Sequence, residues 1–340
     1  MNKRNQFNTL DASKGSVLFV VLQNLFIVLL TALVYGGFRY SEAAGYAITG
    51  LLELTFFLTV VIVCSISGIN IWHASKLNIK PTLAQSLIAI AVCFICLYGF
   101  SNITNAFYYL IRTVGYSSDM SEMVAAGIPE LLIEIVGICV LPAFCEEILF
   151  RGLICNGLKD LGMWPAILIS STFFMLMHGN PDQTVYQWLL GVVLGYMLFI
   201  TGSLWVPIII HFCNNFFITI LNFIASGSQN ETSGGAEQVL NGYEILDLFY
   251  VGVIFALVAA LIIYYIGKYL KKHSKHTMME NKTIATVDGQ SVEAVLENVP
   301  LEIKEVKTKA KMPKSSKMLM ILSLAFLIGT WILAFVEGLA

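Results

Sequence analysis

The residues of this chain that could perform chemistry lie inside long apolar stretches, where polar side chains are costly. An ionisable side chain within a membrane span costs roughly 2.5 kcal/mol or more, so each is a functional candidate. Carboxylates and imidazoles hold and transfer protons near neutral pH, which indicates acid–base chemistry within or beside a membrane. The candidate catalytic residues are Glu146, Glu147, Arg151, His178, His211 and Asn215.

Glu146 and Glu147 differ in the partners that their own helix offers. Glu147 lies four residues before Arg151, so these side chains stack on one helix face in the favourable order. Glu146 lies about 100° further round the helix and has no partner from its own turn. A carboxyl group left unpaired in a low-dielectric environment suits a general acid or base. A salt-bridge network that only packs helices together is the alternative.

A predicted hairpin brings His178 to the depth of Glu146. The chain reverses within 161–165, and Gly162 lies 16 residues after Glu146 and 16 before His178. At a rise of about 1.5 Å per residue, both side chains stand about 24 Å from the turn. A carboxylate and an imidazole at one level are the arrangement that a base and its orienting partner require.

His211 and Asn215 extend this cluster onto a third helix. They are four residues apart and therefore share a face. Alone, a histidine in an apolar helix is more often a packing residue, and an asparagine often bridges two helices. The combination of Glu, His, His and Asn on three neighbouring spans indicates a functional site.

Membrane-spanning helices must position these residues. The chain has 340 residues, 57% hydrophobic and 12% charged, with a mean hydropathy of +0.77. A soluble domain carries roughly 25% charged residues. A spanning helix needs about 20 apolar residues. We therefore predict an all-α fold, a polytopic transmembrane helix bundle of about nine spans with a catalytic core of four or more helices. The predicted spans are 16–36, 45–68, 83–104, 128–158, 163–179, 184–201, 203–225, 244–268 and 318–337.

The sequence divides into five predicted regions. An N-terminal three-span membrane region covers 1–127, and the membrane core with the polar cluster covers 128–226. An outside loop and the eighth span occupy 227–269. Residues 270–317 are rich in Lys and Glu and are predicted to form a charged, mostly disordered cytoplasmic linker. The C-terminal span covers 318–340.

Basic residues orient the predicted bundle. With the N-terminus cytoplasmic, 17 Lys and Arg residues lie inside and only Arg39 and Arg112 lie outside, with Arg151 set aside as part of the cluster. This is the bias of the positive-inside rule. The seven cysteines are scattered through apolar segments, which argues against a disulfide framework. Free thiols suit a bacterial plasma membrane facing a reducing cytoplasm, and an endoplasmic reticulum membrane would give the same pattern. A net charge of −2 gives no basic face for a nucleic-acid partner.

Three motifs of the chain resemble one known family. Glu146-Glu147-x-x-x-Arg151, Phe174-x-x-x-His178 and His211-x-x-x-Asn215 are similar to the motifs of the CAAX protease and bacteriocin-processing family. These intramembrane peptidases include the type II CAAX prenyl endopeptidase. The surroundings agree, with Arg151-Gly152-Leu153 after the first motif and Gly202-Ser203-Leu204-Trp205-x-Pro207 before the third. The resemblance covers about 130–225.

The resemblance implies hydrolysis by an activated water. Glu146, assisted by His178, would deprotonate the water that attacks the scissile carbonyl. His211 and Asn215 would donate hydrogen bonds to the oxyanion. Glu147 and Arg151 would hold the helix and orient the first carboxylate. We expect no cofactor, because the two histidines lack the H-E-x-x-H arrangement; zinc held by Glu146, His178 and His211 is the alternative.

The implied partners are membrane lipid and a membrane-associated peptide or protein substrate, of CAAX-type, lipidated or bacteriocin-related chemistry. Two other functions stay open at this point. An ion-coupled transporter could use Glu53, Glu130 and Glu134 to extend a proton relay, although the sequence has no inverted-repeat halves. A catalytically idle membrane adaptor or self-immunity protein could keep the same fold.

Overall fold

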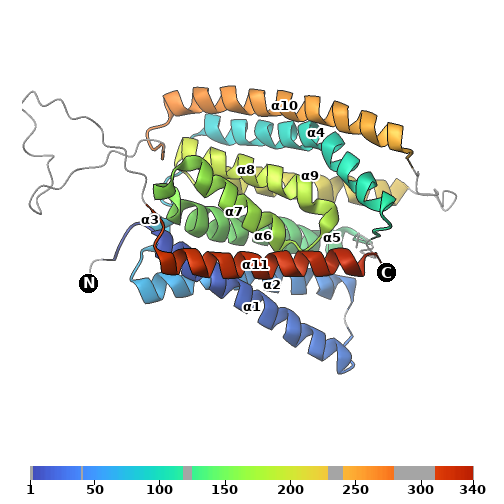
Figure 1. Ribbon diagram of the computed structural model, residues 1–340, viewed down its shortest axis with the longest axis horizontal. Coiled ribbons are helices and arrows are strands. Elements are labelled where there is room, and N and C mark those ends of the chain that lie inside the picture. The colour runs from blue at the N-terminus through green and yellow to red at the C-terminus, as the bar shows by residue number, and fades with distance from the viewer. Residues whose placement is uncertain (1–2, 40, 118–124, 229–239, 279–310, 340) are drawn as a thin grey trace, which may run out of the picture.

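The protein is a bundle of α-helices, as predicted (Figure 1). The computed structural model describes residues 3–39, 41–117, 125–228, 240–278 and 311–339. Within these ranges there is no β-strand, and the extended pairing is a single bridge between Arg4 and Ile69.

The helices follow the predicted spans closely. The first half of the chain contains α1 (Thr9–Tyr35), α2 (Glu42–Ser67), α3 (Ile71–Ala74) and α4 (Leu83–Thr113). A composite helix follows, made of α5 (Ile128–Glu134), η1 (Ile135–Val140), α6 (Leu141–Glu146) and η2 (Glu147–Cys155). The remaining elements are η3 (Lys159–Leu161), α7 (Met163–Met177), η4 (Pro181–Gln183), α8 (Thr184–Thr201), α9 (Trp205–Ser228), α10 (Gly242–His273) and α11 (Lys314–Glu337).

Eight helices of the described chain are long and apolar enough to cross a membrane. The exception among the predicted spans is α7, whose 15 residues extend only about 22 Å, less than the roughly 30 Å of a hydrocarbon core. Loop contacts show that α7 nevertheless runs from one end of the bundle to the other. Before α7, Lys159 donates to Gln6 near the N-terminus at 3.2 Å. After α7, Asp182 pairs with Arg112, at the far end of α4, at 2.8 Å. Nine crossings in alternation place the two termini at opposite ends of the bundle, as Figure 1 shows.

The bundle has an interior layer between two outer ones (Figure 1). In this view α4 and α10 pack along one side, and α1, α2 and α11 lie along the other. Helices α7, α8 and α9 and the composite helix occupy the middle. The apolar window of α8 is 61% buried, whereas those of α1, α10 and α11 are only 17% buried. The outer helices therefore present their apolar side chains to lipid, and the interior layer holds the polar residues.

The predicted span 128–158 is a helix whose hydrogen-bond pattern changes three times. Segments η1 and η2 are π-helical, a pattern that is rare and frequent at functional sites. Between them lies Pro142, which has no N–H for the carbonyl of Ile138 four residues earlier. The side chain of Asn215 on α9 donates to that Ile138 carbonyl oxygen at 2.9 Å. The side-chain amide of Asn215 thus donates a hydrogen bond to a backbone carbonyl that an α-helix would leave unpaired at this point. Inside a membrane, backbone polar groups must find such partners within the protein.

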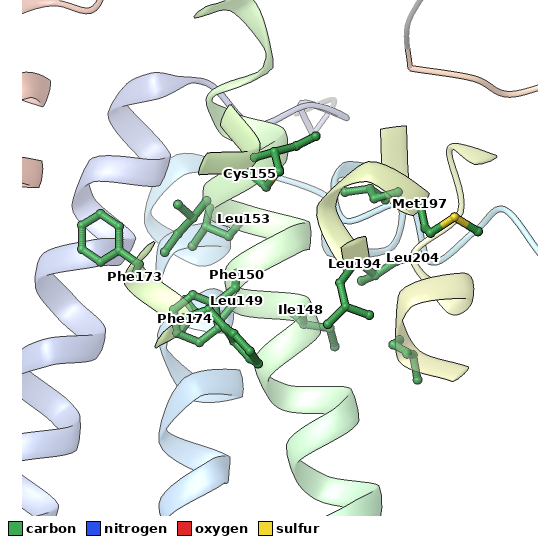
Figure 2. Close-up of a cluster of buried hydrophobic side chains, with 14 of the residues drawn as sticks. Ile148, Leu149, Phe150, Leu153, Cys155, Phe173, Phe174, Leu194, Met197 and Leu204 are labelled. Atoms are coloured by element: carbon green, nitrogen blue, oxygen red, sulfur yellow. The ribbon is translucent and has the colours of Figure 1, made fainter. Parts of the chain in front are cut away.

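Every residue of η2 is buried. Figure 2 shows its apolar side chains Ile148, Leu149, Phe150 and Leu153 packed between Phe173 and Phe174 of α7 on one side and Leu194 and Met197 of α8 on the other. The rings of Phe150 and Phe174 meet edge to face with centroids 5.5 Å apart. A helix enclosed on all sides has a fixed rotation, so the directions of Glu147 and Arg151 are fixed with it.

The end of α3 and the loop between α3 and α4 accept hydrogen bonds from side chains that precede or follow the three predicted motifs. Asn156 donates to the carbonyl of Ala74 at 2.5 Å, Ser203 to Ile79 at 2.5 Å, and Trp205 to Leu77 at 2.8 Å. Gly202 ends α8 with a φ of 66°, a left-handed conformation that glycine adopts readily. The Gly202–Trp205 segment that supported the family resemblance is therefore an anchor between α9 and the N-terminal spans.

Much of the predicted linker and of the predicted outside loop lies outside the described residues. Within the linker predicted at 270–317, residues 279–310 lie outside them, and so do residues 229–239 of the predicted outside loop. Of the linker's described parts, α10 continues to His273 and α11 begins at Lys314. The backbone N–H of Met278 donates to the carbonyl of Phe199 at 2.8 Å, which holds the start of this region against the end of α8.

The close approach of α4 and α10 gives a stability prediction. A Cβ atom built on Gly252 of α10 would lie 2.5 Å from the backbone nitrogen of Ile103 on α4. We expect Gly252→Val to lower the stability by about 1–3 kcal/mol through overpacking, measured as thermal unfolding in detergent. Gly329→Val on α11 is the matched control, because a Cβ there has no atom within 4 Å. Equal melting temperatures for the two variants would show that the two helices do not pack in this way.

Candidate active site

A buried ion pair with a histidine attached to it forms the centre of the site. Glu147 Oε1 accepts a hydrogen bond from Arg151 Nη1 at 2.8 Å and another from His211 Nδ1 at 3.0 Å. Glu147 and Arg151 are completely buried, and His211 is 2% exposed. The Glu147–Arg151 pair predicted from the four-residue spacing is thus present. Its further role is to hold the imidazole of His211 by one nitrogen.

Arg151 has two more contacts that fix its position. Its Nη2 donates to the backbone carbonyl of Gly191 on α8 at 3.3 Å. Its guanidinium carbon lies 4.1 Å from the centroid of the Phe174 ring, which is cation–π geometry. A single cation therefore connects the composite helix to α8 and α7.

Glu146 faces the other nitrogen of His211. Its Oε2 lies 3.9 Å from His211 Nε2, which is longer than a hydrogen bond and is a distance that one water molecule can bridge. Helix α2, which carries the buried Glu53, packs against the segment α6 that ends at Glu146. His211 therefore lies between two glutamates, with Nδ1 fixed on Glu147 and Nε2 directed at Glu146.

His178 lies beside this cluster at the C-terminal end of α7. Its Nδ1 lies 2.8 Å from the carbonyl oxygen of Phe174 and can donate to it, which leaves Nε2 as an acceptor in the neutral ring. The Phe174 ring meets His178 and His211 edge to face, with centroids 4.9 Å and 5.7 Å away. His178 is half-buried, unlike His211. Within the described contacts, Glu146 and His178 do not hydrogen-bond to each other, so any cooperation between them passes through a third group.

Asn215 lies one turn beyond His211 and belongs to a chain of hydrogen bonds. Tyr186 of α8 donates to Asn214 Oδ1, and Asn214 donates to Asn215 Oδ1 at 3.2 Å. Asn215 then donates to Ile138, as described above. One amide hydrogen of Asn215 is thus donated to the composite helix. The second amide hydrogen remains for a hydrogen bond to a substrate.

The zinc alternative would use Glu146, His178 and His211 as ligands. Within the described part of the chain, no three His, Cys, Asp or Glu side chains are placed so that they could hold a metal ion together. His211 Nδ1 is occupied by Glu147, and His178 Nδ1 by a backbone carbonyl. These partners leave Nε2 of both rings free, as they also do in histidines that bind a metal through that nitrogen.

The structure brings four of the six predicted site residues into direct contact and the other two only indirectly. Glu146, Glu147, Arg151 and His211 are in one cluster, whereas His178 joins it through Phe174 and Asn215 through Ile138. Sequence reasoning did not assign Glu53, Tyr186 or Asn214 to this site. Each is a polar residue in an apolar stretch, and this is the signal that could have found them. The other two glutamates of the transporter reading, Glu130 and Glu134, lie on α5 and are separated from Glu146 by η1 and α6.

Comparisons with known proteins address the same segment. Residues 128–217 match the family model described as type II CAAX prenyl endopeptidase Rce1-like. The resemblance predicted from the three motifs is confirmed. A Bacillus subtilis (strain 168) protein named "Putative membrane peptidase YdiL" is 26% identical over 144 residues. That alignment covers 42% of this chain and 59% of the relative. No solved structure matches significantly. The chain is thus similar to intramembrane peptidases over its motif-bearing core, and α1 to α4, α10 and α11 lie outside the family match.

The buried pair gives a second prediction. Arg151→Met leaves the Glu147 carboxylate buried without a cation, and we expect a loss of about 3–5 kcal/mol in the free energy of unfolding. The double variant Glu147→Gln, Arg151→Met removes both charges and should recover most of that loss. Thermal unfolding of the purified protein in detergent measures both.

Arg112→Met is the control for this experiment. Arg112 pairs with Asp182 near the end of the bundle, where the two side chains are 20% and 14% exposed, and its guanidinium carbon lies 3.5 Å from the centroid of the Tyr108 ring. Because this pair keeps some contact with solvent, we expect a smaller loss than for the fully buried pair. A double variant as unstable as Arg151→Met alone would mean that Arg151 acts by packing rather than by charge compensation.

Proposed function

We propose that this chain is an intramembrane endopeptidase that hydrolyses a membrane-associated peptide or protein. The observation that supports it most is the placement of His211 between two buried glutamates, with Nε2 3.9 Å from the Glu146 carboxylate. Hydrolysis needs a base beside a water and a hydrogen-bond donor for the oxyanion, and this pair supplies both. The similarity to membrane peptidases over residues 128–217 points to the same chemistry.

In the proposed reaction, the Glu146 carboxylate accepts a proton from water as the water oxygen bonds to the scissile carbonyl carbon. The other hydrogen of the water is donated to His178 Nε2, which orients the water. The electron pair of the C=O bond moves to the carbonyl oxygen. When the C–N bond breaks, the proton on Glu146 passes to the leaving amine nitrogen. Glu146 thus takes one proton from the water and returns it to the leaving amine, so no other acid or base is needed.

His211 and Asn215 are proposed to stabilise the oxyanion. Because His211 Nδ1–H is donated to Glu147, its Nε2 can donate a second hydrogen bond only as an imidazolium. The carboxylates on either side provide the opposite charge for that cation. Asn215 would contribute the amide hydrogen that Ile138 does not use. Each donor of this kind is typically worth about 10²–10³ in rate.

The proposed reaction uses no metal. This choice is supported by the described residues, among which no three His, Cys, Asp or Glu side chains are placed to hold a metal ion together. The substrate class rests on the depth of the site in the bundle, which favours a peptide already bound to the membrane. A lipidated or CAAX-type peptide is the chemistry that the matched family description names. We place the enzyme in a bacterial plasma membrane with its N-terminus cytoplasmic, because the basic residues of the loops favour that side.

The test of the proposal compares membranes that carry the wild type, Glu146→Gln or His211→Ala. We expect peptides cut in wild-type membranes to be absent with Glu146→Gln and to form about 10²–10³-fold more slowly with His211→Ala, as quantified by mass spectrometry of peptide termini. Glu134→Gln is the control, because Glu134 is a buried glutamate of the same composite helix away from the cluster. Repeating the assay with a zinc chelator should leave the products unchanged.

Two outcomes would contradict parts of this proposal. Loss of the products on chelation would assign Glu146, His178 and His211 to zinc instead. The absence of any Glu146-dependent product would favour an idle adaptor that retains the fold.

A further inference from the structure

A groove between α7 and α11 combines an apolar lining with two basic side chains. The cavity has a volume of about 490 Å³. Its apolar side chains come from both helices and include Ile169, Phe173, Ile321 and Leu324. Lys317 in the first turn of α11 and Lys311, three residues before that helix begins, line it as well. The lining contains no acidic residue.

Helix spacing arranges these side chains as a basic end and an apolar end. On α11, Lys317 is followed by Ile321 and Leu324 at four and seven residues, so all three share one helix face. On α7, Ile169 and Phe173 are four residues apart and share a face in the same way. Leu324 lies about 10 Å further along the helix axis than Lys317, at a rise of about 1.5 Å per residue. The groove therefore runs along the two helices, from cations into apolar side chains.

The basic end of the groove lies at the end of the bundle where α1 and α11 both begin (Figure 1). Ser16 of α1 and Ser323 of α11 hydrogen-bond at 3.2 Å, which joins the first halves of the two helices. We place this end of the bundle in the cytoplasm, as proposed above. Helix α11 belongs to an outer layer and only 17% of its apolar window is buried, so the groove is open to lipid. The lysines thus lie at the level of the lipid headgroups, and the apolar lining lies within the hydrocarbon.

No negative charge of the described chain balances these cations. Both lysines are exposed, and neither forms an ion pair with a described residue. The start of α11 between them is uncapped, because no side chain accepts a hydrogen bond from its first turn. The free N–H groups of a helix start carry a partial positive charge and attract anions. Two ammonium groups and a helix N-terminus therefore lie together beside an apolar groove.

We propose that this groove is a binding site for an anionic phospholipid. The phosphate lies between Lys311, Lys317 and the start of α11, and one acyl chain lies against Phe173 and Leu324. A neutral lipid would fill the apolar part and leave the cations unbalanced, whereas a free phosphate would leave the apolar part uncovered. Basic pockets between spanning helices on the cytoplasmic side bind anionic headgroups in this way. The site is independent of the proposed peptidase function.

The test measures lipid binding to the full-length protein in detergent by native mass spectrometry. The two lipids are dioleoylphosphatidylglycerol, which is anionic, and dioleoylphosphatidylcholine, which has the same acyl chains and no net charge. We expect the first phosphatidylglycerol to bind about 25-fold more tightly, because each of the two lysines near the headgroup contributes a factor of about five. The double variant Lys311→Gln, Lys317→Gln should bind the two lipids equally.

Two further variants separate the groove from general positive charge. Ile321→Trp keeps both lysines and fills the groove, so the binding of both lipids should fall. The double variant Lys268→Gln, Lys271→Gln is the matched control, because these exposed lysines near the end of α10 do not line the groove. It should keep the preference for phosphatidylglycerol. Each variant without lipid should melt at the wild-type temperature, which shows that it is folded.

Equal binding of the two lipids by the wild type would overturn the proposal, and so would an equal loss of preference in the α10 control or unchanged binding in Ile321→Trp. Displacement of phosphatidylglycerol by an equal concentration of inorganic phosphate would instead show a phosphate site that needs no lipid. Binding that appears only when residues 279–310 are replaced by a Gly-Ser sequence of equal length would show that this linker occupies the groove in place of lipid.

Discussion

The carboxylate oxygen of Glu147 that accepts hydrogen bonds from both Arg151 and His211 is the interaction on which the rest of the site depends. A buried carboxylate is tolerated only when its charge is compensated and its oxygens are hydrogen-bonded. Arg151 supplies the charge from the same helix, and it can also reach α8 because Gly191 has no side chain. A Cβ at Gly191 would lie 3.3 Å from Arg151 Nη2 and 3.0 Å from the side chain of Ser171. The contacts that compensate the charge of Glu147 thus fix how closely the composite helix, α8 and α9 pack together.

The same interaction determines what His211 can do. An imidazole free at both nitrogens would rotate and would have no preferred partner. With Nδ1 held by Glu147, the ring plane and the direction of Nε2 are fixed towards Glu146. The resemblance implied that Glu147 and Arg151 orient the first carboxylate, whereas in the structure their hydrogen bonds reach His211 and the carbonyl of Gly191.

Spacing along the chain predicted the parts of the site that lie within one helix or one hairpin. The Glu147–Arg151 pair follows from a four-residue separation, and the hairpin at Gly162 brings α7 back along η2. The π-helical segments could not be predicted in this way, because their apolar pattern is that of any buried helix. Nor could the face of α2 that packs against α6 and η2, since the rotation of α2 about its axis depends on packing with helices far along the chain. Asn215 was assigned to the oxyanion alone, although Pro142, four residues after Ile138, already indicated a carbonyl that needed another donor.

Several buried polar atoms of the site lack a hydrogen bond to the protein, which bears on the proposed hydrolysis within a membrane. One carboxyl oxygen each of Glu53, Glu146 and Glu147 is buried without a hydrogen bond to the protein. With His211 Nε2 they form a polar interior in an otherwise apolar bundle, and a buried water needs two to four such partners. Outside the family match, α1 and α2 pack against η2, and α4 packs against α9. These spans thus enclose the helices that carry the polar cluster.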